Sequence, residues 1–213
     1  MAIAKVGASG TVFLATTGAS VGMTGGYGQS PTAGNLLIMS VTMSTTVATA
    51  TSCTTPAGWT AGPAGGAPTG TANYKAALYI FWKVAAGADT APVVTVAGGT
   101  YSTAVVIEEF SGITSATVDA ASTVVTKNTA GALNESGNLV NAITTTSNPT
   151  LLWSMLGQVS ETSTTSNTLD WASSTKNQDA YFGAYVRTST ASKLVVPGSN
   201  SASVSWSGTT PNT

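Results

Sequence analysis

Residues 35–43 read NLLIMSVTM, a nearly continuous apolar run with the length of a single β-strand. A run of this kind, without regular alternation of apolar and polar residues, is typical of a strand that is covered on both faces. Two further segments read as strands, YKAALYIFWKVA at residues 74–85 and STAVVIEEF at residues 102–110. These three segments predict the centre of a β-sheet.

The segment at residues 74–85 alternates, and successive side chains of a strand point to opposite faces. The face that we expect in the core consists of Ala76, Leu78, Ile80, Trp82 and Val84. The other face, which carries aromatic residues beside lysines, is expected to be a partly exposed surface or a subunit contact. It consists of Lys75, Tyr79, Phe81 and Lys83.

Shorter strand patterns flank these segments on both sides, and no ten-residue helical pattern occurs. They lie at residues 11–16, 92–97, 139–146, 150–157, 179–188 and 202–206. Ser147, Asn148 and Pro149 predict a turn that joins two of these strands as a pair. In the strand at 179–188 we expect Arg187 to point outward. Together the patterns predict an all-β fold, a two-sheet antiparallel sandwich with a jelly-roll-like topology.

Composition supports a sheet protein of one domain. The 213 residues include 38 threonines and 25 serines, whereas only 7% of the residues are charged and the net charge is −1. Threonine and valine suit a pleated surface. We expect residues 1–33 to form an N-terminal arm or edge strand and residues 34–213 to form the sandwich domain. The few lysines and arginines cannot form a positive patch for phosphate groups. Nucleic acid is therefore not an expected partner.

The chain has no histidine, which excludes Ser-His-Asp and Cys-His nucleophile systems and metal sites that contain histidine. Phosphate-binding and dinucleotide-binding glycine motifs are also missing. The acids are scattered singly, without calcium-loop spacing: Asp89, Asp119, Glu135, Glu161, Asp170 and Asp179. We therefore predict no catalytic, metal-binding or cofactor-binding residue, and no cofactor.

Glu108 and Glu109 are the remaining candidates for hydrolysis by paired carboxylates. Neighbours on a strand project from opposite faces, so these two cannot face one substrate together. Each could instead pair with a distant acid such as Asp170 or Glu161. The alternative is that one of them lies in or beside the core, held by a lysine, an arginine or a backbone donor.

Exposed aromatic rings could bind carbohydrate, or they could cover a sheet end or an interface. The candidates are Trp59, Tyr74, Tyr101, Trp171, Tyr181 and Tyr185. The single cysteine, Cys53, excludes an intrachain disulfide and is expected to be a buried apolar thiol. Neither a signal peptide nor a membrane span is visible, so we expect synthesis in a cytoplasm without Sec export and no membrane partner.

The ordered set NLLIMSVTM, TTPAGWT, YIFWKVAAGADTAPVVTVAGG, STAVVIEEFSGI and VDAAS resembles a β-sandwich domain of tailed-phage virion proteins. The resemblance covers residues 34–122, and residues 151–157 agree less closely. Asn35 departs from the pattern, because relatives often carry aspartate before the apolar run.

This resemblance implies a non-enzymatic virion protein of the capsid decoration or minor tail type. It implies binding to the major capsid protein or other virion proteins, a homo-oligomer with a trimer favoured, and a place in the virion after assembly in the host cytoplasm. The alternative is a tail-associated or fibre module that binds host-surface glycan through loop aromatics. The sequence leaves head and tail locations open.

Overall fold

The protein is described by a computed structural model that covers most of the chain. The described residues are 2–14, 20–22, 30–45, 52–62, 75–97, 100–113, 117–119, 121, 137–147, 149–159, 168–182 and 186–207. Within these ranges all regular secondary structure is β-strand, and all strand pairs are antiparallel. No helix in this part of the chain has the length and apolarity needed to cross a membrane. The predicted all-β class is confirmed.

Sheet A has five strands in the order β1-β8-β3-β6-β5. Its strands are β1 (Ala4–Leu14), β8 (Thr100–Ser111), β3 (Leu36–Thr45), β6 (Lys75–Val84) and β5 (Thr60–Ala61). The run at residues 35–43 forms β3 at the centre of this sheet, and its side chains are buried on both faces, as predicted. The strand expected at 11–16 begins earlier, at Ala4, and β1 is an outer strand of the sheet.

Sheet B consists of three short strands in the order β2-β7-β4. They are β2 (Ser20–Gly22), β7 (Val93–Ala97) and β4 (Ser52–Thr54). The apolar faces of sheets A and B meet in the largest hydrophobic cluster of the described residues. It contains Met39, Val41, Met43, Ala77, Phe81, Val94, Val96, Val105 and Ile107.

The faces of β6 differ from the prediction. Phe81 is 2% exposed and packs in the cluster between sheets A and B, with Tyr79 against it, although this face was expected to be partly exposed. Val84, expected in the core, is 49% exposed. Alternation could not separate the faces, because β6 lies inside a stack of sheets and both of its faces are covered. Lys83 lies on the same face as Phe81, and its ion pair with Asp89 offsets the cost of partly burying its ammonium group.

The C-terminal third forms two more sheets. Sheet D has the order β10-β13-β12, with β10 (Thr150–Val159), β13 (Val186–Val195) and β12 (Thr175–Phe182). Sheet C has the order β11-β14-β9, with β11 (Thr168–Ala172), β14 (Gly198–Ser207) and β9 (Gly137–Thr145). The chain crosses between the two sheets after β9, after β11 and after β13, so together they resemble one three-stranded ribbon folded over on itself.

Apolar residues fill the fold of this ribbon. The clusters between sheets C and D contain Leu156, Trp171, Ala191 and Val204, and Leu152, Val195 and Ala202. At two of the corners the backbone takes positive φ values, 60° at Ser173 and 130° at Gly198. These conformations let the chain turn sharply from one layer into the next.

Two predictions for this region are wrong, one about strand pairing and one about where a strand ends. The strands expected as a hairpin around Ser147 do not pair with each other: β9 pairs with β14 and β10 pairs with β13. The turn carries the chain into the next layer, because Leu152 and Leu156 are buried against sheet C. The strand predicted at 179–188 is two strands, the end of β12 and the start of β13, which pair with each other.

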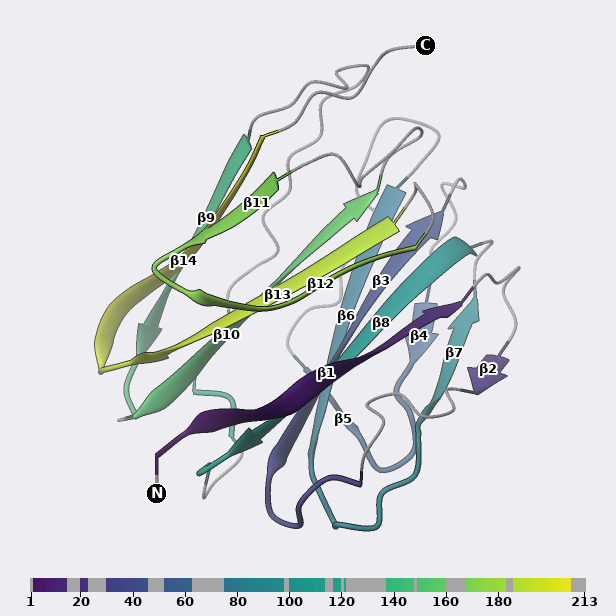
Figure 1. The fold of residues 1–213 in the computed structure, drawn as a ribbon, viewed down its shortest axis with the longest axis horizontal. Coiled ribbons are helices and arrows are strands. Elements are labelled where there is room, and N and C mark those ends of the chain that lie inside the picture. Colours follow the sequence, from purple (N-terminus) through teal and green to yellow (C-terminus); the bar gives the residue numbers. More distant parts are fainter. Residues whose placement is uncertain are drawn as a thin grey trace.

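The four sheets stack in the order B, A, D, C, as Figure 1 shows from right to left. Sheets A and D approach closely at Gly157 on β10, where an added Cβ would lie 2.0 Å from Cδ2 of Leu78. Sheets A and B form a sandwich, as expected, but the described strands divide into four sheets. The jelly-roll topology stays a prediction.

Replacing Met39 by alanine tests the cluster between sheets A and B. Met39 is fully buried, so Met39→Ala removes apolar contacts and leaves a cavity, and we expect the free energy of unfolding to fall by about 2–5 kcal/mol. Val93→Ala on the neighbouring sheet is the control, since Val93 is 52% exposed and its loss is expected to cost about 0.5 kcal/mol or less. Urea unfolding followed by circular dichroism measures both, and equal losses would contradict this assignment of the core.

Candidate functional site

Glu108 lies on β8 and is 1% exposed, in the layer between sheets A and D. Its carboxylate accepts hydrogen bonds from Nε1 of Trp153 at 2.6 Å and from the Thr190 hydroxyl at 3.0 Å. The Asn177 amide donates a longer bond of 3.4 Å. These donors come from β10, β13 and β12, so one carboxylate of sheet A contacts all three strands of sheet D.

The layer between sheets A and D also contains neutral polar contacts. The hydroxyl of Thr188 donates to the hydroxyl of Thr42, and both side chains are fully buried. At the edge of the layer, the amide of Gln178 donates to the Thr11 hydroxyl at 3.3 Å. A buried polar group costs free energy unless it is hydrogen-bonded, so these bonds make the contact of sheets A and D directional.

Glu109 points to the opposite face of β8. One oxygen, Oε1, accepts from the backbone N–H of Thr32 at 2.9 Å and from the amide of Asn35 at 2.6 Å. It thereby holds the segment that leads into β3. The two glutamates face different ways, as predicted, and each is engaged by neighbouring residues. Glu108 occupies the expected core position, and Trp153, Thr190 and Asn177 are among its hydrogen-bond donors.

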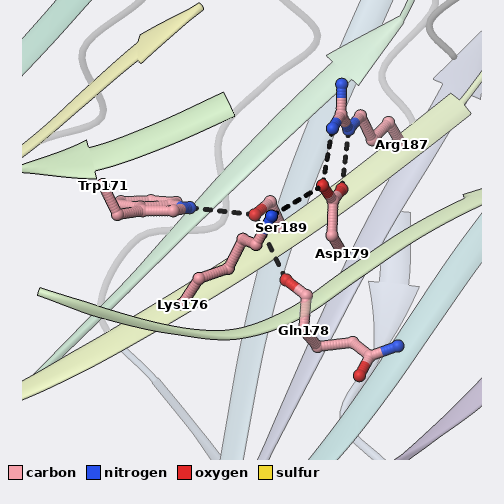
Figure 2. Close-up of polar contacts among 6 residues, drawn as sticks. All are labelled: Trp171, Lys176, Gln178, Asp179, Arg187 and Ser189. Carbon is pink, nitrogen blue, oxygen red and sulfur yellow. Dashed lines mark hydrogen bonds and ion pairs between the residues drawn. The ribbon is translucent and has the colours of Figure 1, made fainter. Parts of the chain in front are cut away.

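A second polar cluster lies on the other face of sheet D, toward sheet C (Figure 2). Arg187 forms a bidentate ion pair with Asp179, with Nε–Oδ1 and Nη2–Oδ2 distances of 2.7 and 2.6 Å. The Arg187 side chain is only 4% exposed, so the prediction that it points outward is wrong. Nζ of Lys176 lies 3.6 Å from Asp179 Oδ2. Pairing with Asp179 offsets the cost of burying the guanidinium.

Trp171 joins the same cluster from β11. Its Nε1 donates to the Ser189 hydroxyl at 2.9 Å, and that hydroxyl donates to the Gln178 carbonyl at 3.2 Å (Figure 2). The ring is 6% exposed, so of the two alternatives for Trp171, packing and a surface for carbohydrate, the structure shows packing. The indole is instead used to fasten sheet C to sheet D.

The other candidate aromatic that the structure describes, Trp59, is half-buried against the cluster between sheets A and B. The Lys83 ammonium lies 5.9 Å from its ring centroid, within the range of a cation–π contact. Tyr74 and Tyr185, and the side chains of Tyr101 and Tyr181, lie outside the described residues. For Trp59 and Trp171 the packing alternative is therefore the one observed.

Asp89 and Asp119 each hold a loop. Burial by itself would raise the pKa of Asp89, but the ion pair with Lys83 and the backbone N–H groups of Ala86 and Gly87 hold it below its ordinary value. The hydroxyl and backbone N–H of Thr146, with the N–H of Ser147, lower the pKa of Asp119. Both carboxylates are thus stabilised as anions.

The remaining candidates form no common site in the described part of the chain. Asp170 is exposed, and Glu135 and Glu161 lie outside the described residues. No three acids or cysteines among the described residues lie close enough to hold a metal ion. Burial raises the pKa of the Cys53 thiol to about 12, which agrees with its expected role as an apolar packing residue because a reactive cysteine needs a thiolate.

No protein-family model matches the sequence, and no curated protein or solved structure matches it either. The fold and its polar clusters define an all-β protein of stacked antiparallel sheets, in which the buried side chain of Glu108 joins sheet A to sheet D. Of the six described carboxylates, five accept hydrogen bonds from neighbouring residues and the sixth, Asp170, is exposed.

Glu108→Gln tests the role of the carboxylate between sheets A and D. A glutamine there keeps the volume, but only its single oxygen can accept, from Trp153 and Asn177, so the Thr190 hydroxyl must turn and accept from the new amide. Hydrogen bonds to a neutral amide are weaker than those to a carboxylate, so we expect a loss of about 1 kcal/mol in the free energy of unfolding. Glu109→Gln is the matched control, because a glutamine retains the single oxygen that accepts from Thr32 and Asn35. Denaturant unfolding followed by tryptophan fluorescence compares them, and a larger loss for Glu109→Gln would count against this role.

The lowered pKa of Asp89 predicts that the stability of the folded protein decreases at acidic pH. Its pKa in the folded chain lies below the unfolded value, so its contribution is present above about pH 4 and is lost as the pH falls through the lower, folded value. We expect the melting temperature of the wild-type protein to fall on acidification in this window. Asp89→Asn should be less stable at neutral pH and should show a smaller acid-dependent loss. An unchanged acid-dependent loss in Asp89→Asn would contradict the assignment.

Proposed function

We propose that this protein is a non-enzymatic structural component of a tailed-phage virion, and specifically a capsid decoration protein on the outside of the head lattice. The resemblance of residues 34–122 to virion sandwich domains supports the virion role, and the all-β fold is consistent with it. The chain then needs no cofactor, and its partners are the major capsid protein or other virion proteins. It resides in the virion after assembly in the host cytoplasm.

The hydrogen bonding of the carboxylates is the observation that supports a non-enzymatic role. Each of five described carboxylates is bound by donors from a neighbouring segment: Glu108, Glu109, Asp89, Asp119 and Asp179. A general acid or base must reach a substrate proton at hydrogen-bond distance. These acids are instead engaged in joining sheets and loops, which is the chemistry of a structural protein.

Charge supports an assembly role in the same way. The chain carries 7 lysines and arginines and 8 acids, and several of those described are paired with one another. Contacts built on backbone pairing and burial are less sensitive to salt than contacts between exposed charges. Such a surface suits a protomer of a symmetric assembly, and we propose a homo-oligomer. Neither nucleic acid nor a membrane is a proposed partner.

A tail-associated or fibre module that binds host glycan is the alternative. It receives less support, because the rings of Trp59 and Trp171 are used in packing between sheets.

The experiment adds the purified chain, labelled with a fluorophore on its N-terminus, to capsids and to intact host cells, and measures what is retained after sedimentation. Decoration predicts retention by capsids and, in a reconstruction of the virion, on the order of hundreds of copies on the head lattice. Retention by cells alone, or a few copies at the tail, favours the glycan-binding alternative. Absence from virions, or glycan cleavage that Glu108→Gln abolishes, would overturn the proposal.

A further inference from the structure

The outer strands of the four sheets differ in how well they are protected. An outer strand presents unpaired N–H and C=O groups, and proteins guard such edges by short length, bulges or charges. In sheet B both outer strands have three residues, and in sheet A β5 has two. The other outer strand of sheet A, β1, carries Lys5 and a register shift between Val6 and Gly10.

The outer strands of sheets C and D on one side of the stack are guarded as well. β12 carries Lys176 and Asp179, with a register shift between Lys176 and Gln178. β11 has five residues and includes the exposed Asp170. This side of sheets C and D therefore resists the addition of another strand.

The opposite side of sheets C and D has none of these protections. β9 and β10 are nine and ten residues long, and each keeps a continuous register with its inner neighbour. Residues 137–159, which contain both strands, include no lysine, arginine, aspartate or glutamate. Among the described residues, no strand pairs with the outer edge of either one.

The side chains of β10 are also incompletely covered. Trp153 and Met155, which point toward sheet A, are half-buried, although the adjacent Leu152 and Leu156 are buried against sheet C. A strand placed beside β10 would cover the exposed parts of these apolar side chains. It would also satisfy the outward N–H and C=O groups of the strand.

We propose that β10 pairs with β10 of a second copy of this chain in an antiparallel arrangement about a two-fold axis. An antiparallel edge is complementary to itself, and an uncharged strand meets its own copy without repulsion between like charges. Because sheet C is stacked on sheet D, an axis along the normal of sheet D also brings β9 toward β9 of the second copy. Sheets C and D then continue from one copy into the other.

This pairing depends on the sheet edges and is independent of the virion role. It predicts two-fold symmetry, in contrast to the trimer that the resemblance favours, so the two ideas fail separately. A trimer would overturn the two-fold pairing without contradicting capsid decoration. Failure of the chain to bind capsids would leave the pairing standing.

The test measures the mass of the full chain in solution by sedimentation velocity, over a range of concentrations. We expect a dimer for the wild-type protein. Leu151→Lys, at a half-buried position of β10 opposite the exposed Leu194, adds a charge to this edge and is expected to shift the protein from dimer to monomer without changing the far-ultraviolet circular dichroism. Thr175→Lys, at an exposed position of β12, is the matched control and should stay dimeric.

Hydrogen–deuterium exchange of the wild-type protein provides a second readout that does not depend on any variant. The pairing predicts that amides of β10 exchange more slowly as the concentration rises, whereas those of β12 do not change. A monomer or a trimer at all concentrations would overturn the proposal, and so would an undiminished dimer in a folded Leu151→Lys variant. Should Leu151→Lys fail to fold, concentration-dependent protection at β12 instead of β10 overturns the proposal equally.

Discussion

Glu108 brings a carboxyl side chain into a layer between two sheets, where a polar group without hydrogen-bond partners would destabilise the fold. Trp153, Thr190 and Asn177 supply them from three different strands of sheet D. Hydrogen bonds are directional, so this carboxylate sets how sheet D lies on sheet A more narrowly than apolar contact could. The glycine at position 157 then allows β10 to approach Leu78 and Thr42.

The three interfaces of the stack are built from different chemistry. Sheets A and B meet through a broad apolar cluster, and burial of that surface is the main source of stability. Sheets D and C meet through smaller apolar clusters together with the Trp171–Ser189 bond, and the Arg187–Asp179 pair joins β13 to β12 within sheet D. The A–D interface lies between them. A chain with few charged residues thus uses one of them, Glu108, to join two layers.

This use of charge connects the fold to the proposed role. Five of the six described carboxylates and the arginine are engaged within the chain, which leaves few described charges for contacts with other molecules. Contacts through shape and strand pairing suit a subunit of an assembly. The uncharged strands β9 and β10 indicate how one subunit could join another.

Local pattern predicted the longer strands at 35–43, 74–85 and 102–110 and the all-β class, since these runs carry strong β propensity and lack helical periodicity, but it merged β12 with β13 and missed β11. Alternation also placed Glu108 and Glu109 on opposite faces. It failed for Phe81, because a strand covered on both sides has no single core face, and for Val84, because the last residue of β6 lies at the exposed end of the strand. It failed for Arg187 because nothing local to it reveals that Asp179 lies beside it across the strand pair. Which layer follows which, and which donors surround Glu108, depend on contacts between residues up to 167 positions apart. Such contacts form only when burial between layers outweighs the local hairpin, so they belong to the tertiary structure.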